Sequence, residues 1–209
     1  MTHGKFITLE GGEGAGKSTQ VKFLAAFLRG KGVEVVQTRE VGGAPAAEAI
    51  RELWLTKGDG YWDPLSELLL ITAARREHLA KTILPALARG AWVISDRFAD
   101  STRAYQGIGL GLGLDVVEEF YRRIAPDFEP DLTLLLDLPV ATGLARMNAR
   151  GGEDDRYQQK NIAFHQTLRD AYLTLAQAYK QRFRIIDAAQ DATAVSAAIE
   201  QTVRGHFKL

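Results

Sequence analysis

Short runs of apolar residues alternate along the chain with longer segments in which apolar residues recur every three or four positions. The runs are typical of buried strands, and the longer segments indicate amphipathic helices. We predict strands at the run that begins with Phe6 and at 33–38, 91–96, 132–137 and 183–187. Because helices follow the strands, the pattern predicts an α/β fold in three layers, with a five-stranded parallel sheet covered by helices on both faces.

Several predicted helices carry residues that commonly start or interrupt a helix. The first begins near Lys17, and a long helical region begins where Asp63 suits an N-cap and Pro64 a first turn. This region ends at 89–90, and Pro85 should kink it or break it late. The other predicted helices are 44–55, a segment from Arg97 to Gln106, 114–124, one that starts at Val140, 161–182 and 193–207.

Two glycine-rich segments separate these helices. Residues 107–113 contain four glycines in seven positions, which predicts a mobile turn. Residues 150–156 combine glycine with five charged residues, a composition too polar to pack, so we predict a short lid at about 148–160. A solvated surface loop is the alternative, because many charged runs are no more than that. We expect residues 1–209 to form a single domain.

The composition excludes several classes of protein. Of 209 residues 46% are hydrophobic, enough for one sizeable core. Lys and Arg total 26, as do Asp and Glu, so no overall basic field favours nucleic acid or an anionic membrane. The absence of cysteine excludes disulfides, thiolate metal sites and cysteine nucleophiles. With no membrane-length apolar run and no signal peptide, we expect a soluble, cytoplasmic protein without membrane or nucleic-acid partners.

The segment after the first strand carries the clearest chemistry. Positions 11–18 match G-x-x-x-x-G-K-[ST], the phosphate-binding P-loop, and the flanking strand and helix argue against a chance match. Glycine lets backbone N–H groups wrap a polyphosphate, and the helix that follows directs its positive end at the anion. Lys17 can reach the β- and γ-phosphates of ATP, and Ser18 can bind Mg²⁺. The predicted ATP-binding residues here are Gly11, Gly12, Glu13, Gly14, Ala15, Gly16, Lys17, Ser18 and Thr19.

Polar residues also end the other predicted strands, at the edge where parallel sheets bind ligands. Asp96 is a candidate to orient Mg²⁺ or its waters, although a plain strand-end cap would look the same. Arg97 beside it can hold an acceptor phosphate through two parallel hydrogen bonds. Arg39 lies at the end of another strand, and we expect Asp187, at the last strand end, to contact ATP.

Arginines near a glycine-hinged segment suit a lid that closes over phosphates and excludes water. Arg150 and Arg156 lie in this segment, and we expect Arg146, one helical turn earlier, to contact ATP. Arg75 is a weaker candidate, because an ordinary charged helix face explains it equally well. The chain lacks an Asn-Lys-x-Asp guanine-reading motif and is too short for the coupling elements of a motor or transporter ATPase. Among P-loop proteins, a kinase that acts on a small metabolite or a nucleotide remains as the predicted class.

A set of motifs resembles bacterial thymidylate kinase in order and spacing over nearly the whole chain. They are Gly11–Thr19, Thr38-Arg39-Glu40-Val41-Gly42-Gly43, Ala73-Ala74-Arg75, Asp96-Arg97-Phe98 with Ser101, Thr102 and Tyr105-Gln106-Gly107, Asp137-Leu138-Pro139, and Ala149-Arg150-Gly151 before Asp155-Arg156. The resemblance implies an ATP-dependent nucleoside monophosphate kinase that converts dTMP to dTDP for dTTP synthesis. It further implies Mg²⁺ as a cofactor and a homodimer.

The resemblance also implies roles for single residues on the acceptor side. Glu13 takes the place of the carboxylate that contacts the 3′-hydroxyl of the acceptor sugar. Arg97 matches the acceptor-phosphate arginine, and Arg39 also lies by the acceptor. Arg75 matches the arginine that hydrogen-bonds the base. The residues that match the wall beside base and sugar are Ser101, Thr102 and Tyr105.

The interior of the P-loop, residues 12–15, contains no basic residue. In the family this implies that the lid supplies the catalytic arginine, here Arg150 or Arg156, in addition to Lys17 and Arg97. The lid has an extra residue at 151–152, so the register of its two arginines stays open.

Two departures from the family fall on the base pocket. The family commonly has Phe where this chain has Ile71, and Pro where it has Val41. Ile71 gives the base an apolar contact but no aromatic stacking, which is worth roughly 1–3 kcal/mol per base elsewhere. The sequence therefore predicts phosphoryl transfer more firmly than it predicts which base the acceptor carries. A 5-modified deoxyuridylate such as 5-hydroxymethyl-dUMP is an alternative acceptor, and a non-catalytic nucleotide-binding regulator is the alternative from another class.

Overall fold

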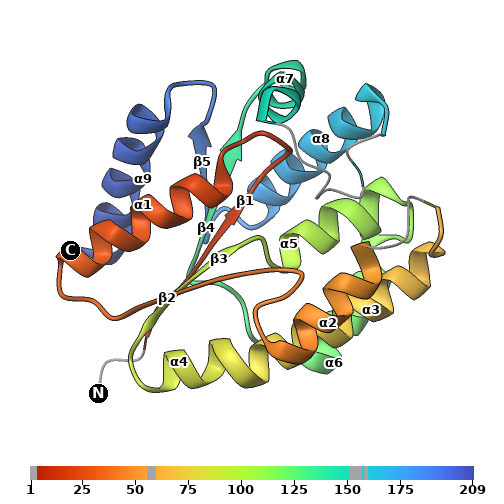
Figure 1. The fold of residues 1–209 in the computed structure, drawn as a ribbon, viewed down its shortest axis with the longest axis horizontal. Coiled ribbons are helices and arrows are strands. Elements are labelled where there is room, and N and C mark those ends of the chain that lie inside the picture. Colours follow the sequence, from red (N-terminus) through yellow and green to blue (C-terminus); the bar gives the residue numbers. More distant parts are fainter. Residues whose placement is uncertain (1–3, 56–59, 151–156, 158–159) are drawn as a thin grey trace.

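The computed structural model describes residues 4–55, 60–150, 157 and 160–209. Its centre is a five-stranded sheet, in which all neighbouring strands are parallel and the order is β2-β3-β1-β4-β5 (Figure 1). The strands are β1 (Phe6–Glu10), β2 (Val35–Arg39), β3 (Trp92–Asp96), β4 (Leu132–Asp137) and β5 (Phe183–Asp187). The predicted parallel α/β sheet is confirmed.

The register of the sheet brings the carboxyl ends of its strands to one edge. Leu9 of β1 pairs with Asp96 of β3, and Asp96 also pairs with Arg39 of β2. On the other side of β1, Asp137 of β4 pairs with Asp187 of β5. The polar residues at the strand ends therefore share the edge at which β1 continues into the P-loop.

Helices cover both faces of this sheet (Figure 1). α1 (Lys17–Gly30) and α9 (Ala192–Phe207) pack together on one face. The other face carries α4 (Leu84–Ala88), α6 (Leu114–Ile124) and α8 (Ile162–Ala178), and this layer continues into α3 (Pro64–His78) and α2 (Pro45–Leu55). α7 (Val140–Arg150) packs against α8. No helix in the described ranges is long and apolar enough to cross a membrane.

Alternate strand residues face the two helical layers. Ile7 and Leu9 lie in the core under α1 and α9, whereas Phe6 packs with Phe98 and Tyr121 on the opposite face. Both sides of each central strand are therefore buried, which explains why the strands read as continuous apolar runs rather than as alternating patterns.

The long helical region predicted between 63 and 90 is divided into three parts. Asp63 caps α3 as predicted, because its side chain accepts from the N–H groups of Leu65 and Ser66. A π-helical segment, η1 (Leu79–Ile83), separates α3 from α4. Pro85 lies in the first turn of α4 and has no N–H to donate to the preceding turn. The π-turn immediately before Pro85 accommodates this loss, so the predicted late interruption is confirmed.

The prediction of a mobile turn at 107–113 was wrong for its first half. A short helix, α5 (Ala99–Thr102), leads directly into a second π-helical segment, η2 (Arg103–Gly109). Gly107 is buried, and a Cβ on Gly109 would lie 2.9 Å from Leu168 Cδ2. Close packing of Gly107 against α6 and of Gly109 against α8 explains these glycines, whereas the positive φ of 76° at Gly111 marks the turn itself.

Several other predicted boundaries shift by only a few residues. α6 and β5 have the predicted bounds, and α8 starts at Ile162, one residue later than predicted, with Asn161 as its N-cap. α8 ends at Ala178 rather than at 182, and Arg182, in the turn before β5, donates to Asp100. Of the predicted lid at 148–160, residues 151–156 and 158–159 lie outside the described residues, and so does Arg156.

Candidate active site

The P-loop links the end of β1 to the start of α1, and its glycines are required by its geometry. Gly11 and Gly14 have φ values of 139° and 68°. A Cβ on Gly14 would lie 2.0 Å from the Gly143 carbonyl oxygen, a contact that no side chain could avoid. Lys17 is buried, and its Nζ donates to the carbonyl oxygens of Gly11 at 3.0 Å and Gly12 at 2.8 Å. The loop thus holds the ammonium group of Lys17 against its own backbone.

Ser18 and Asp96 meet at the edge of this loop. Ser18 Oγ, in the first turn of α1, donates to Asp96 Oδ2 at the end of β3, at 2.5 Å. A hydroxyl and a carboxylate placed together are oxygen ligands of the kind that Mg²⁺ prefers, with water and substrate phosphates completing its shell. These two oxygen ligands therefore fit the predicted Mg²⁺. Ser18 and Asp96 are far apart in the sequence and come together because the sheet places the end of β3 beside the P-loop.

Arg97 connects the P-loop to the acceptor side. Its φ of 68° is unusual for a residue other than glycine, and the surrounding contacts hold it there. Its Nη2 donates to Glu13 Oε1 at 2.5 Å, and its Nη1 donates to Gly11 O at 3.2 Å and to Ser101 Oγ at 3.1 Å. Tyr105 Oη also donates to Glu13 Oε1, at 2.7 Å. The predicted acceptor residues Glu13, Arg97 and Tyr105 thus form one polar cluster.

A buried carboxylate that the sequence did not single out lies behind this cluster. Glu10, the last residue of β1, is fully buried. Its Oε1 accepts from Phe98 N at 2.7 Å, and its Oε2 accepts from Ser101 Oγ at 2.6 Å. Burial, together with the nearby charge of Asp100, raises the pKa of Glu10 to about 7. Ser101 therefore joins Glu10 to Arg97.

Arg75 is part of the site and not of an exposed helix face. It is buried, its Nε donates to Glu40 Oε2 at 2.7 Å and its Nη2 donates to Thr102 Oγ1 at 2.8 Å. Its guanidinium lies 5.2 Å from the centre of the Phe98 ring. Ile71, one helical turn earlier on α3, is also buried. Its two hydrogen bonds hold the guanidinium in a fixed orientation.

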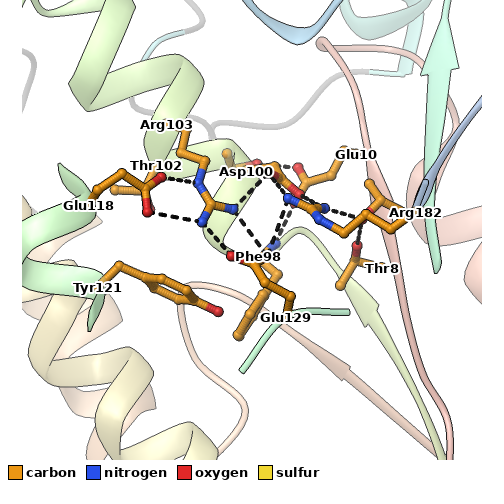
Figure 2. Close-up of polar contacts among 12 residues, drawn as sticks. Thr8, Glu10, Phe98, Asp100, Thr102, Arg103, Glu118, Tyr121, Glu129 and Arg182 are labelled. Carbon is orange, nitrogen blue, oxygen red and sulfur yellow. Dashed lines mark hydrogen bonds and ion pairs between the residues drawn. The ribbon is translucent and has the colours of Figure 1, made fainter. Parts of the chain in front are cut away.

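The helix that carries Ser101 and Thr102 is anchored by buried ion pairs (Figure 2). Asp100 accepts from Arg103 Nη1 at 2.9 Å and from Arg182 Nη1 at 2.6 Å. Burial would raise the pKa of Asp100, but the hydrogen bond and charge of Arg182 and the charge of Arg103 outweigh it and lower that pKa. Glu118 and Glu129 accept from Arg103 on its other sides. Two arginines thus tie α5 to α6 and to the turn between α8 and β5.

Most of the predicted site residues line one cavity of about 390 Å³, the size of a small-ligand pocket. The predicted residues around it are Glu13, Gly14, Ala15, Gly16, Lys17, Ser18, Thr19, Arg39, Ile71, Arg75, Asp96, Arg97, Ser101, Thr102 and Tyr105. Arg39 is exposed and paired with Glu48 at 3.0 Å. Residues that sequence reasoning did not propose also line this cavity, among them Arg51, Trp54 and Tyr157.

Two predicted ATP residues meet elsewhere, at the loop after β5. Arg146 Nη1 donates to Ala188 O at 2.7 Å, and its Nη2 donates to Ala189 O at 2.8 Å. Asp187 Oδ1 accepts from Ala189 N at 2.9 Å. The two side chains therefore shape the same loop, and neither lines the cavity. Arg150 is the last residue of α7.

Comparisons with known proteins agree on one family. A family model described as thymidylate kinase matches residues 9–199. The chain is 50% identical over 204 residues to a thymidylate kinase of Magnetococcus marinus, covering 98% of this chain and 97% of that protein. It is 53% identical over 197 residues to one of Pseudomonas fluorescens, covering 94% and 93%. A crystal structure of thymidylate kinase from Ehrlichia chaffeensis superposes with a TM-score of 0.80 at 33% identity, over 96% of this chain and 99% of that one.

Proposed function

The chain belongs to the thymidylate kinase family, whose members are nucleoside monophosphate kinases, and we propose that it transfers the γ-phosphate of ATP to dTMP. The product is dTDP, a precursor of dTTP. The observation that carries this proposal is a single cavity that the P-loop lines together with Asp96, Arg97 and Arg75. The relatives do not favour a 5-modified deoxyuridylate as acceptor or a non-catalytic regulator.

On the donor side, backbone N–H groups of the P-loop bind the ATP phosphates. Ser18 and Asp96 would hold Mg²⁺, which when bound neutralises charge on the phosphate oxygens. Lys17 adds a fixed positive charge that is positioned by two carbonyl groups. Phosphoryl transfer needs little covalent help from the protein, so these charges supply most of the catalysis.

On the acceptor side, Arg97 binds the monophosphate, and Glu13 accepts from the sugar 3′-hydroxyl. Both side chains are held in place by Tyr105, whose hydroxyl contacts each of them. The attacking oxygen of a monophosphate is already anionic at neutral pH, so its orientation matters more than the removal of a proton. Arg75 and Thr102 hydrogen-bond the edge of the base, next to Ile71.

We assign Arg150 and Arg156 to a lid that supplies positive charge to the transferred phosphate and excludes water. Arg146 and Asp187 shape the loop after β5, on the ATP side. Water exclusion is needed because ATP would otherwise be hydrolysed in place of phosphorylating the acceptor.

An ADP-release assay with a panel of acceptors tests this function. The panel is dTMP, dUMP, dCMP, dAMP, dGMP and 5-hydroxymethyl-dUMP, each with ATP and Mg²⁺. We expect the highest kcat/KM with dTMP and only background ADP without an acceptor. Background turnover with every acceptor would refute the kinase. A preference for 5-hydroxymethyl-dUMP would correct the acceptor alone.

We also propose that the protein acts as a homodimer. Leu65 and Leu69 are exposed one helical turn apart on α3, and Leu53 is exposed on the adjacent α2. Apolar residues grouped on neighbouring helices are typical of a surface that a second subunit covers. Sedimentation equilibrium should show twice the chain mass. Leu69→Glu should shift the protein to the monomer, and a monomeric wild type would refute the proposal.

A further inference from the structure

The acceptor end of the cavity has an aromatic wall that comes from outside the recognised motifs. Trp54 lies in the last turn of α2, is half-buried and lines the cavity. Tyr157 lines it as well, with its ring centre 6.3 Å from that of Trp54 and the two rings tilted by 57°. No other tryptophan lies among the residues that line the cavity in the described part of the chain.

Packing on two sides positions the Trp54 ring. On one side it packs against the small apolar cluster that contains Val41 and Ile71. On the other side it packs against the cluster that contains Tyr105 and Tyr157. A ring that bridges two clusters loses little further freedom when a ligand binds, so its contact with the ligand carries little entropic cost.

Polar side chains line the same end of the cavity. Arg75 and Thr102 are hydrogen-bonded to each other, and Gln106 lines the cavity beside them. A pyrimidine base has polar atoms around its rim and two apolar faces. A pocket that offers a polar set and an aromatic wall therefore matches the base better than it matches the sugar or the phosphate.

We propose that Trp54 is a specificity-determining residue that packs on a face of the acceptor base, with Tyr157 beside it. This inference rests on the proposed function, because it takes the ligand to be a pyrimidine nucleoside monophosphate. Ile71 contributes an apolar surface without a π-system, so Trp54, with Tyr157 beside it, supplies an aromatic contact at this end of the cavity. The base is thereby recognised by its edge through Arg75 and by its face through Trp54.

Binding measurements on Trp54→Leu test the contact without requiring turnover. We expect the Kd for dTMP to rise about tenfold, which corresponds to ~1.4 kcal/mol. Trp54→Phe keeps an aromatic face and should recover most of the loss. The matched control ligand is deoxyribose 5-phosphate, which has the sugar and phosphate of dTMP but no base. Its affinity should be the same for the wild type and for Trp54→Leu.

Equal losses of affinity for dTMP and deoxyribose 5-phosphate would show that Trp54 only supports the fold, and would overturn the proposal. An unchanged Kd for dTMP would overturn it too. Circular dichroism and the Tm of each variant establish that the fold is retained. If the proposed function itself were wrong, the wild-type protein would not phosphorylate dTMP, which is a different result from a change in the affinity of the Trp54 variants.

Tryptophan fluorescence gives an independent readout in the folded wild-type protein. The chain has three tryptophans, and the other two, Trp62 and Trp92, do not line the cavity. Addition of dTMP should quench the emission of the wild type, of Trp62→Phe and of Trp92→Phe, but not that of Trp54→Phe. Quenching that persists in Trp54→Phe would place the base away from this ring.

Discussion

Replacement of Glu10 by Gln should remove a pH dependence of stability that the wild-type protein carries. Glu10 is fully buried, and burial followed by the charge of Asp100 raises its pKa from 4.5 to about 7. The native state therefore binds the proton of this carboxyl more tightly than the unfolded chain does. Its contribution to stability is complete below the unfolded pKa of 4.5 and is lost as the pH rises to about 7.

The size of this effect follows from the change in pKa. The difference between 4.5 and about 7 corresponds to roughly 3 kcal/mol, at about 1.36 kcal/mol for each pKa unit. Gln cannot ionise, but its carbonyl oxygen can still accept from Phe98 N. The free energy of unfolding of the wild type, relative to that of Glu10→Gln, should therefore fall by roughly 3 kcal/mol between about pH 4 and 8.

Urea unfolding followed by circular dichroism across this pH range measures the difference. Glu119→Gln, at an exposed position on α6, is the control for loss of a surface carboxylate. Parallel profiles for the wild type and Glu10→Gln would mean that the pKa of Glu10 is not raised, and would refute the reasoning. Because Ser101 contacts both Glu10 and Arg97, the pH dependence of the KM for dTMP in Glu10→Gln should be reduced to that of the substrate phosphate, whose second pKa is about 6.

Three further changes test other parts of the structure. Lys17→Ala should lower kcat by about two to three orders of magnitude with the fold retained, and near-normal turnover would contradict the role of the loop. Ile71→Phe should lower the Kd for dTMP in calorimetry, whereas an unchanged Kd would place the base elsewhere. Arg103→Ala leaves Asp100 with one fewer partner and should destabilise the protein by about 3–5 kcal/mol in urea unfolding; a loss below about 1 kcal/mol would show that the buried network is dispensable.

The centre of the sheet could be predicted well because β1, β3 and β4 are buried on both faces. Continuous apolar runs that end in Asp96 and Asp137 mark two of these strands without any tertiary information. The π-helical segments could not be predicted in the same way. One directly precedes Pro85, which has no N–H to donate, and the other contains Gly109, whose close approach to α8 depends on the packed fold.

Some residues of the candidate site could likewise be predicted from the sequence, and others could not. The P-loop and the strand-end residues Asp96 and Arg97 were predictable, since ligands bind at the carboxyl edge of a parallel sheet. Glu10 was not, because a carboxylate at a strand end gives no sign that Ser101 and Phe98 will enclose it. Trp54 resembles any apolar residue of an amphipathic helix until the fold brings it to the cavity.

The transfer of labelled phosphate tests the central claim most directly. The protein is incubated with dTMP, Mg²⁺ and ATP labelled in its γ-phosphate, and the products are separated by chromatography. We predict that the label appears in dTDP, in proportion to the dTMP consumed, and that Arg97→Ala abolishes this transfer. Label that appears only in inorganic phosphate, or that never leaves ATP, would contradict the assignment of this cavity to phosphoryl transfer onto dTMP.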